Sequence, residues 1–392
     1  MKVLFINAVC GTGSTGRIVT DLAAMLHSQG DTAKVCFGVG HPRNVPDGDA
    51  VKIATAADYY IHNALSRLTD HAGLYSRNPT QRLIREIETF GPDIVHIHNL
   101  HGYYVNYEVL MSYLTGTRKP LVMTLHDCWT FTGHCTHFDR IGCTQWQTRC
   151  VTCPQLRSYP ICYSRGDVGR NFDRKNAAFT APENLHIVTP SRWLAGLAQS
   201  SFLGKHPIHV IPNGIDTAVF HPTPGADLSR NKPIVLAVAN VWEKNKGLSD
   251  MMTLAQLLGD SYQVVLVGLT PKQKAALPGN ILGICRTNDP RELAQLYTAA
   301  EVFVNPTYQE TFSMVNLEAQ ACGTPVITYA SGGAPETILP GMGRTVPRGD
   351  VHALAAAIRE GLPVPASVPV DRLDKSHTYK SYLALYRALT GD

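Results

Sequence analysis

The order of apolar and polar positions changes between two patterns along almost the whole chain. Short apolar runs, typical of buried strands, alternate with segments in which apolar residues recur every three or four positions, as in amphipathic helices. In the first half this predicts strands at 2–7, 33–37, 93–98, 121–125, 185–188 and 209–211. Between them it predicts helices at 17–28, 79–90, 105–114 and 192–200. Strands that alternate with helices predict βαβ units and a buried parallel sheet.

A proline-rich stretch at 221–225, followed by polar residues to 233, interrupts this alternation and predicts a linker. Strands are then expected at 234–239, 263–267, 301–304 and 326–328, and helices at 249–258, 290–300, 313–322 and 351–360. An amphipathic helix at 377–390 ends the chain. The fold class predicted is α/β, with two Rossmann-like doubly wound domains facing a central cleft. The expected boundaries are 1–221, 222–375 and a C-terminal helix at 376–392 that packs on the first domain.

Composition fits two globular domains and excludes several other classes. The 392 residues are 44% hydrophobic and 17% charged, which excludes a disordered chain or a coiled coil. A net charge of +4 suits an anionic ligand or a membrane surface, but it is too small for a dedicated nucleic-acid binder. The apolar start, 1–10, lacks the basic region and cleavage pattern of a signal peptide, so a cytoplasmic location with reduced thiols is expected.

The segment 305–326 carries the strongest chemical signal. A strand ends before it, and Ser313 is a candidate N-cap for the next helix, whose free N–H groups suit a phosphate. Glu310 precedes that helix and Glu318 lies on it, about 12 Å further along the helix axis. One carboxylate can then bind a sugar and the other a ribose, with a diphosphate between them. The alternative is that both glutamates are ordinary solvated charges. The loop residues grouped with this donor site are Thr311, Phe312 and Ser313.

Candidate residues of the first half also follow predicted strands. His126 and Asp127 follow the strand at 121–125, where the fold places ligands, and His98 ends another strand. His98 is equally consistent with substrate contact and with a packed position near the sheet. A glycine loop after the first strand contains Gly13, and Arg17 follows it at a helix start. This loop is either an anion-binding turn or a plain structural turn.

Six of the ten cysteines lie in a predicted insertion at 128–162. Cys135, Cys143, Cys150 and Cys153 are separated by seven, six and two residues, which suits a closed tetrahedral zinc site. Such a site would be structural, because four thiolates leave no open position for catalysis. Disulfides in an oxidising compartment and free thiols are the alternatives.

Several segments together resemble retaining GT-B glycosyltransferases of glycosyltransferase family 4. The similarity is in the glutamate pair eight residues apart and in four further elements: 189–193, 210–216, 246–248 and 331–336. The stretch 124–135 and the cysteines after it are similar to a subgroup that contains colanic-acid and other exopolysaccharide glycosyltransferases.

The resemblance implies a function and roles for the candidate residues. The second domain would bind a nucleotide diphosphate sugar, with a UDP-sugar as the expected donor, and the first would present a lipid-linked or polysaccharide acceptor. His126 would contact the donor sugar, and Glu310 would act with it in catalysis. Lys246 matches the phosphate-binding lysine, whereas the usual arginine is replaced near Asn240, so Lys244 or Arg17 would compensate. No cofactor is implied for catalysis, and the Asp47-Gly-Asp49 sequence is interpreted as a turn.

The resemblance also implies a cytoplasmic enzyme, with peripheral contact to the cytoplasmic face of the membrane as an option. Two other functions are alternatives. A nucleotide-sugar epimerase shares the architecture, but the glutamate pair beside 331–336 favours transfer. A zinc-bearing nucleic-acid-binding protein is disfavoured, because no run of Lys and Arg interleaved with aromatic residues accompanies the cysteines.

Overall fold

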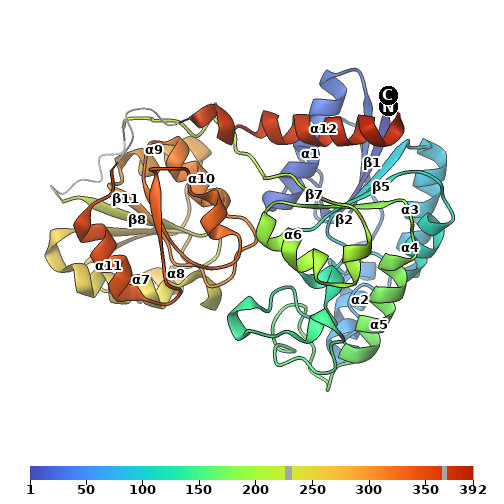
Figure 1. The fold of residues 1–392 in the computed structure, drawn as a ribbon, viewed down its shortest axis with the longest axis horizontal. Helices are drawn as coiled ribbons and strands as arrows, with labels where there is room; N and C mark the ends of the chain where they lie inside the picture. Colours follow the sequence, from blue (N-terminus) through green and yellow to red (C-terminus); the bar gives the residue numbers. More distant parts are fainter. Residues whose placement is uncertain (226–231, 364–368, 392) are drawn as a thin grey trace. The chain divides into compact units, whose positions relative to one another are not determined.

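The computed structural model describes residues 1–225, 232–363 and 369–391, which form two compact units. The first unit comprises Met1–Ile211 together with the last helix from Tyr379, and the second comprises Pro212–Thr378 (Figure 1). Each unit is built around its own parallel sheet.

The sheet of the first unit has seven parallel strands in the order β3-β2-β1-β4-β5-β6-β7. The strands are β1 (Lys2–Val9), β2 (Thr32–Val39), β3 (Ala50–Lys52), β4 (Ile94–Ile97), β5 (Leu121–Thr124), β6 (Leu185–Thr189) and β7 (Ile208–Val210). The helices are α1 (Gly13–Ser28), α2 (Ala56–Thr69), α3 (Arg77–Phe90), α4 (Tyr107–Thr115), α5 (Val168–Thr180), α6 (Arg192–Gln199) and α12 (Lys375–Thr390). The strand order reverses beside β1, which is the arrangement of a doubly wound domain.

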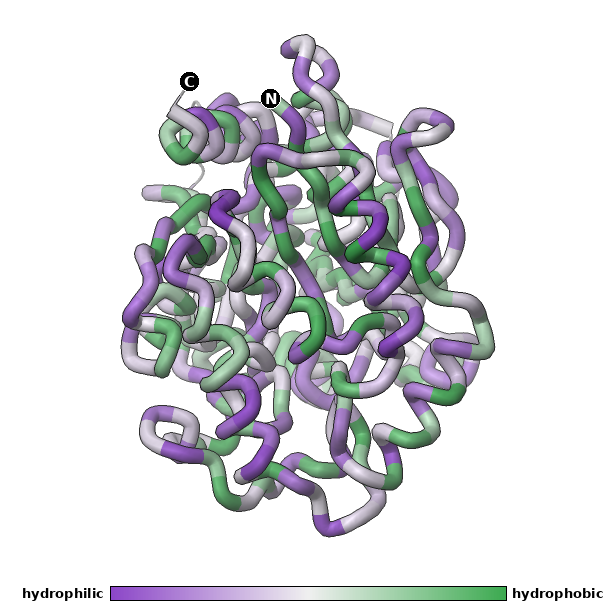
Figure 2. The backbone as a smooth tube through the Cα atoms, turned by 90° about the vertical axis from the view of Figure 1, so that its right-hand side faces the viewer, coloured by the Kyte–Doolittle hydropathy of each residue, from purple (hydrophilic) through white to green (hydrophobic). Residues whose placement is uncertain are grey.

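Alternate residues of β1 enter two different apolar layers. Leu4 and Ile6 belong to the core on one face, whereas Val3 and Phe5 belong to the core on the other. The strand is apolar without interruption because both faces of the sheet are covered. Figure 2 shows the hydrophobic strands inside and the helices around them, which alternate between hydrophobic and hydrophilic residues.

The sheet of the second unit has six parallel strands in the order β10-β9-β8-β11-β12-β13. The strands are β8 (Ile234–Val238), β9 (Gln263–Val267), β10 (Ile281–Ile284), β11 (Val302–Asn305), β12 (Val326–Tyr329) and β13 (Gly343–Val346). The helices are α7 (Leu248–Leu258), α8 (Pro271–Ala275), α9 (Pro290–Ala299), α10 (Met314–Ala321) and α11 (Val351–Glu360). Here too, alternate residues of the first strand, β8, enter two different cores.

The first unit ends at Ile211, ten residues before the predicted boundary at 221. The reason is that Ile215 and Phe220 pack with Leu373 in a core of the second unit. The chain returns to the first unit at Tyr379, three residues after the expected start of the C-terminal helix. From there, Tyr382 of α12 packs among β1 and α1 residues.

Six elements were not predicted: β3, α2, α5, α8, β10 and β13. The predicted turn at Asp47–Asp49 is confirmed, with Gly48 at a φ of 91°. Within the described ranges, no helix combines the length and the apolar character needed to cross a bilayer.

Candidate active site

Three loops of the second unit meet at the carboxyl ends of β8, β11 and β12, which are neighbours in the sheet. The amide of Tyr308, in the loop after β11, donates to the carbonyl of Asn245 in the loop after β8, at 2.8 Å. The amide of Gly333, in the loop after β12, donates to the carbonyl of Glu310 at 2.9 Å. These bonds hold the three loops in fixed positions at the edge where such folds bind ligands.

Two glycines allow the loops to approach so closely. Gly247 has a φ of 73°, and a Cβ atom there would lie 2.3 Å from the carbonyl oxygen of Pro306. Gly332 has a φ of 53°, and its Cβ would lie 1.9 Å from the carbonyl oxygen of Glu310. Any other residue at either position would push the loop that carries Glu310 away.

Lys246 and Glu310 form an ion pair across two of these loops. The Nζ atom of Lys246 lies 2.9 Å from Oε2 of Glu310. The two side chains are 37% and 18% exposed, so a ligand can reach them, and the pair itself contributes little stability. The structure therefore brings the predicted phosphate-binding lysine and the predicted sugar-binding carboxylate together. Lys244 is exposed in the turn that precedes Lys246.

The start of α10 differs in one detail from the prediction. Ser313 occupies the N-cap position, but its side chain does not cap the helix. Its hydroxyl instead accepts a hydrogen bond of 2.8 Å from Asn305, at the end of β11. The predicted N-cap position is therefore confirmed, although the side chain of Ser313 is bonded to Asn305 and not to the helix. Thr311 and Phe312, just before the helix, are almost fully buried.

Glu318 lies on α10 and is half-buried. Its Oε2 atom accepts a hydrogen bond of 3.0 Å from the hydroxyl of Tyr297, which is buried on α9. Burial, and then the charge of Glu318, raises the pKa of Tyr297 well above its ordinary value. Tyr297 therefore stays protonated and holds the carboxylate in place, a contact that the sequence did not indicate.

In the first unit, His98 and His126 lie at the ends of the adjacent strands β4 and β5. Their rings stack with an angle of 14° between the planes, and Nδ1 of His98 lies 2.9 Å from Nε2 of His126. Burial lowers the pKa of His126 to about 4 and that of His98 well below its ordinary value. Both rings are therefore neutral near pH 7, and one donates its N–H to the other.

Asp127 was expected to orient His126 or to contact the acceptor. Its Oδ2 atom accepts a hydrogen bond of 2.8 Å from His101, and its Oδ1 atom accepts one from the amide of Trp129. Although burial would raise the pKa of Asp127, the bonds and charge of His101 and its other neighbours lower it to about 2. The other ring nitrogen of His101 lies 3.0 Å from the hydroxyl of Tyr159, in the cysteine-rich insertion.

A second set of contacts links the histidines to α12. His96, two residues before His98, hydrogen-bonds the hydroxyl of Tyr386 at 2.6 Å and that of Thr124 at 2.8 Å. Thr124 in turn hydrogen-bonds Tyr382 at 2.9 Å. The end of the chain therefore supports the strands that carry His98 and His126. His96 itself is fully buried.

The glycine loop follows β1, which is the neighbour of β4. Gly13 begins α1 with a φ of 66°, and Arg17 is exposed on the first turn of the helix. The amide of Gly11 donates to the carbonyl of Gly16 at 3.1 Å and closes the loop.

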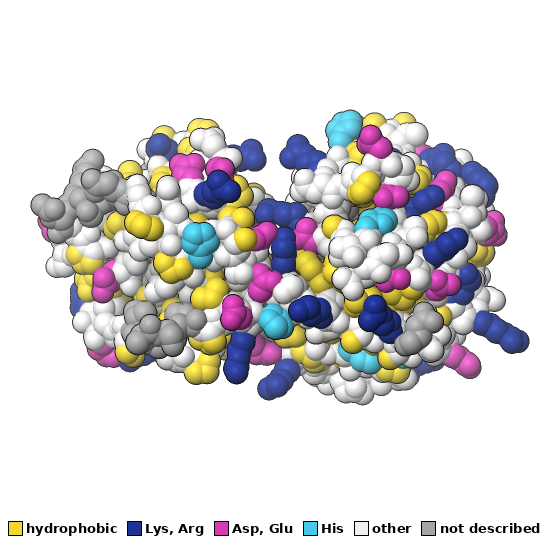
Figure 3. All heavy atoms as spheres, turned by 90° about the horizontal axis from the view of Figure 1, so that it is seen from above, with side chains coloured by type: hydrophobic (Ala, Val, Ile, Leu, Met, Phe, Trp, Pro, Cys, Tyr) yellow, Lys and Arg dark blue, Asp and Glu magenta, His cyan; other side chains and the backbone are white. Residues whose placement is uncertain are grey.

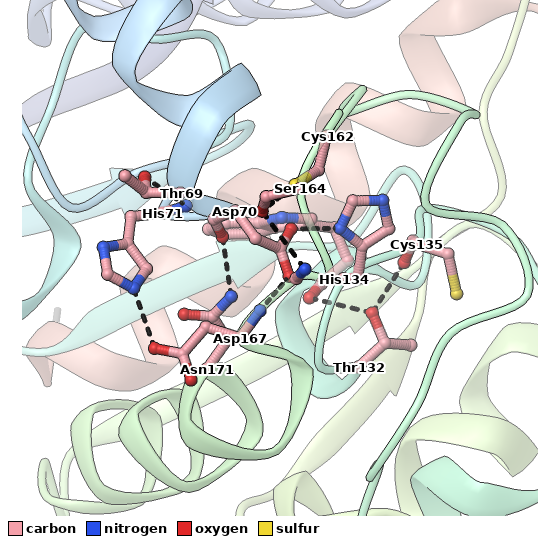
Figure 4. A network of polar contacts seen from close by, with 12 residues as sticks. Thr69, Asp70, His71, Thr132, His134, Cys135, Cys162, Ser164, Asp167 and Asn171 are labelled. Carbon is pink, nitrogen blue, oxygen red and sulfur yellow. Dashed lines mark hydrogen bonds and ion pairs between the residues drawn. The ribbon is translucent and has the colours of Figure 1, made fainter.

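A network centred on Asp70 connects the end of α2 to the insertion at 128–162 and to the residues just after it (Figure 4). Asp70 is the left-handed C-cap of α2, and its carboxylate hydrogen-bonds the ring of His134 and, at 3.0 Å, the amide of Asp167. Its carbonyl accepts from the side chain of Asn171 at 2.6 Å. The insertion contains only single turns of 3₁₀ helix, and the buried bond between His134 and Asp70 fastens it to the end of α2.

The cysteines of the insertion are neighbours, but they do not form a recognisable metal site. The thiols of Cys135 and Cys153 are hydrogen-bonded, and this bond lowers the pKa of Cys153 to about 6. Cys150 is near both Cys143 and Cys153. In the part of the chain that the structure describes, no three His, Cys, Asp or Glu side chains are arranged to hold a metal ion. The structure therefore gives the zinc prediction no support.

Two models of known protein families match the chain, one over most of each unit. The family model described as "Glycosyltransferase Family 4" matches residues 15–219, and that described as "Glycosyl transferases group 1" matches residues 232–362. The chain belongs to glycosyltransferase family 4. The predicted family and the prediction that the protein is an enzyme are both confirmed.

Similar proteins extend this family assignment. WcaC of Escherichia coli (strain K12), named as a proposed colanic acid biosynthesis glycosyl transferase, is 26% identical over 379 residues, which are 90% of this chain and 89% of WcaC. Sucrose-phosphate synthase from Thermosynechococcus elongatus has a TM-score of 0.66 at 19% identity, covering 99% of this chain and 96% of its own. HepE of Anabaena, solved with UDP-glucose, has a TM-score of 0.58 at 16% identity, covering 100% and 95%. These structures share the GT-B fold, so the predicted fold class is confirmed.

Proposed function

We propose that this member of family 4 is a retaining glycosyltransferase. It moves a sugar from a nucleotide diphosphate sugar to a lipid-linked or polysaccharide acceptor in cell-surface polysaccharide synthesis. The observation that carries the proposal is the meeting of three loops in the second unit, which presents Lys246, Glu310 and the start of α10 at one sheet edge.

The donor is expected to lie along this edge. The N–H groups of the first turn of α10 suit the diphosphate, because the serine at the N-cap does not bond to them. Lys246 would exchange its bond with Glu310 for a bond with phosphate, which frees the carboxylate for the sugar. Lys244 and Arg17 are exposed cations that can supply the charge of the missing family arginine. Glu318 would bind the ribose, in the orientation that Tyr297 gives it.

The acceptor side is assigned to the first unit. His126 would position the donor sugar against the acceptor hydroxyl, and it is neutral and held by His98. His126 is not proposed to transfer a proton. Asp127 stays ionised and can accept a hydrogen bond from an acceptor hydroxyl, in addition to those from His101 and Trp129. Gly13 lets the loop after β1 approach either substrate.

The UDP-sugar donor is assigned by likeness to HepE, which was solved with UDP-glucose. The polysaccharide acceptor is assigned by likeness to WcaC, which is named for colanic acid biosynthesis. A cytoplasmic enzyme in peripheral contact with the membrane follows from a lipid-linked acceptor. On the face seen in Figure 3, Lys and Arg side chains are interspersed with Asp and Glu, and the net charge of the chain is only +4, which together disfavour a nucleic-acid partner.

A thermal-shift screen of nucleotide sugars tests the donor assignment. A ligand at a hundred times its dissociation constant stabilises the folded state by about 2.7 kcal/mol. UDP-sugars should raise the melting temperature, and Lys246→Ala should reduce that shift, whereas Lys272→Ala on α8 should not. If GDP- or ADP-sugars alone stabilise the protein, the UDP assignment is wrong. If no nucleotide sugar does, the donor site itself is contradicted.

A further inference from the structure

Helix α2 presents an apolar face to solvent. Tyr60, Ile61, Leu65 and Leu68 are 68%, 59%, 37% and 64% exposed. Ala57 and Ala64 complete the row and are also exposed. These six positions recur every three or four residues, which places them along one side of the helix. Of the eleven large apolar side chains exposed in the described residues, four lie in this stripe.

The opposite face of α2 fixes how the helix lies. His62 and Ser66 are buried, and the ring of His62 accepts a 3.0 Å bond from the amide of Gly73 and lies 2.7 Å from the hydroxyl of Ser76. Thr55 caps the first turn in a capping box with Asp58. The helix is therefore anchored on one side and capped, and its apolar stripe is a constant feature of the surface.

Aromatic side chains connect α2 to the candidate acceptor site. Tyr59 and His62 contact the ring of Tyr103, at 5.9 and 5.7 Å between centroids. Tyr103 contacts Tyr159, which hydrogen-bonds His101, the partner of Asp127. A chain of three rings, Tyr103, Tyr159 and His101, thus connects the helix that carries the stripe to Asp127.

The C-terminal end of the stripe is aromatic and basic. Tyr163 is 54% exposed, and the guanidinium groups of Arg67 and Arg157 lie 6.0 and 5.1 Å from its ring centroid. Arg165, two residues after Tyr163, is also exposed. The amide of Tyr163 donates to the carbonyl of Arg67 at 2.6 Å, so this residue lies directly beside the end of α2. Apolar side chains flanked by tyrosine and arginine are the composition of helices that lie in the headgroup region of a bilayer.

We propose that α2 docks flat on an anionic membrane surface, with its apolar stripe among the acyl chains and the arginines at the headgroups. This rests on the proposed function, since a lipid-linked acceptor requires the enzyme to work at a membrane surface. The partner is a bilayer because its chemistry matches both parts of the surface: acyl chains match the stripe, and anionic headgroups match the arginines.

Flotation of the full-length protein with vesicles tests this surface without any sugar transfer. Vesicles of phosphatidylcholine are compared with vesicles containing about one-third phosphatidylglycerol, for the wild type, Ile61→Glu/Leu68→Glu and Leu282→Glu. The two substituted α2 residues are exposed, so their replacement is compatible with the fold, which circular dichroism checks. Leu282 is 37% exposed on β10 of the other unit and serves as the matched control. We expect the double variant to lose at least tenfold in binding to the anionic vesicles, and Leu282→Glu to bind like the wild type.

The outcomes are separable from those of the donor screen. The proposal is overturned if the wild type binds neither kind of vesicle, or if the double variant binds as well as the wild type. It is also overturned if the wild type is a dimer in ultracentrifugation that the double variant dissociates, because a second copy would then cover the stripe. A protein that binds vesicles but no nucleotide sugar would leave this surface in place and contradict the proposed function instead.

Discussion

Within each unit, the charged and polar side chains of the candidate site bind partners that are far away in the sequence. Lys246 pairs with Glu310, and Tyr297 donates to Glu318. The sequence indicated Glu310, Glu318 and Lys246 because they stand at fixed spacings in loops and on a helix. It did not indicate their partners, because a bond such as that of Asp127 with His101 depends on how neighbouring strands place their loops.

At the residue scale, Glu318→Ala should weaken binding of the donor nucleotide by about 1.5–3 kcal/mol, as expected for a lost hydrogen bond to a charged group. The substitution also removes the acceptor of the buried Tyr297 hydroxyl, so a matched control is needed. Tyr297→Phe removes the same bond and keeps the carboxylate. Calorimetric titration should show a large loss for Glu318→Ala and a small one for Tyr297→Phe. Equal affinities of Glu318→Ala and the wild type would remove Glu318 from the site.

His126→Ala should lower the turnover number by on the order of a hundredfold and leave the affinity for nucleotide almost unchanged. The reason is that His126 orients the reacting groups and is assigned to the acceptor side. Burial lowers the pKa of His126 to about 4, so this residue does not titrate near pH 6.5. The pH–rate profiles of the wild type and the variant should therefore have the same shape around pH 6.5. Steady-state kinetics from pH 5 to 9 would show this. A lost limb near 6.5 would indicate proton transfer by His126.

At the scale of elements, apolar periodicity predicted most strands to within two residues, because buried parallel strands are apolar throughout. The missed elements have weaker patterns. β3 has three half-exposed or exposed residues, and the apolar side of α2 faces solvent, so neither has the pattern of a core element. The structure of the insertion could not be predicted, because it has only single 3₁₀ turns and its bond to Asp70 spans 64 residues of sequence (Figure 4).

Zinc at Cys135, Cys143, Cys150 and Cys153 stays a prediction of the sequence. If it is bound, the purified protein should contain about one zinc per chain, and the four thiols should react only after a chelator is added. Elemental analysis with thiol titration, using Cys36 as a buried internal control, measures both. If the protein contains no metal and the thiols react freely, the zinc prediction is wrong. Disulfides would contradict the expected reducing compartment.

At the scale of the whole molecule, the family assignment rests on matches that span both units. The sequence predicted the family and the two doubly wound domains, since fold and motifs depend on local pattern. It missed the placement of 212–220, because those residues contribute to a core completed by Leu373, far away in the chain.

Acid should destabilise the first unit through its buried histidines. Burial lowers the pKa of His62 to about 3 and that of His126 to about 4, below the ordinary 6.5 of an unfolded chain. Unfolding therefore takes up protons, and the stability these neutral rings contribute above pH 6.5 is lost progressively as the pH falls toward 3. Urea unfolding between pH 8 and 4 measures this. The free energy of unfolding should fall less steeply with falling pH in His62→Gln than in the wild type. An equally steep fall in that variant would contradict the account of His62.

The central claim, transfer with retention from a nucleotide diphosphate sugar, is tested most directly by the configuration of the new glycosidic bond. The enzyme is supplied with the α-configured UDP-sugar selected by the thermal-shift screen and with a lipid-linked saccharide acceptor, and the product is examined by proton NMR at its anomeric centre. The account predicts an α-linked product, formed without a covalent sugar–enzyme intermediate. A β-linked product would contradict the retaining assignment, and with it the roles given to Glu310 and His126.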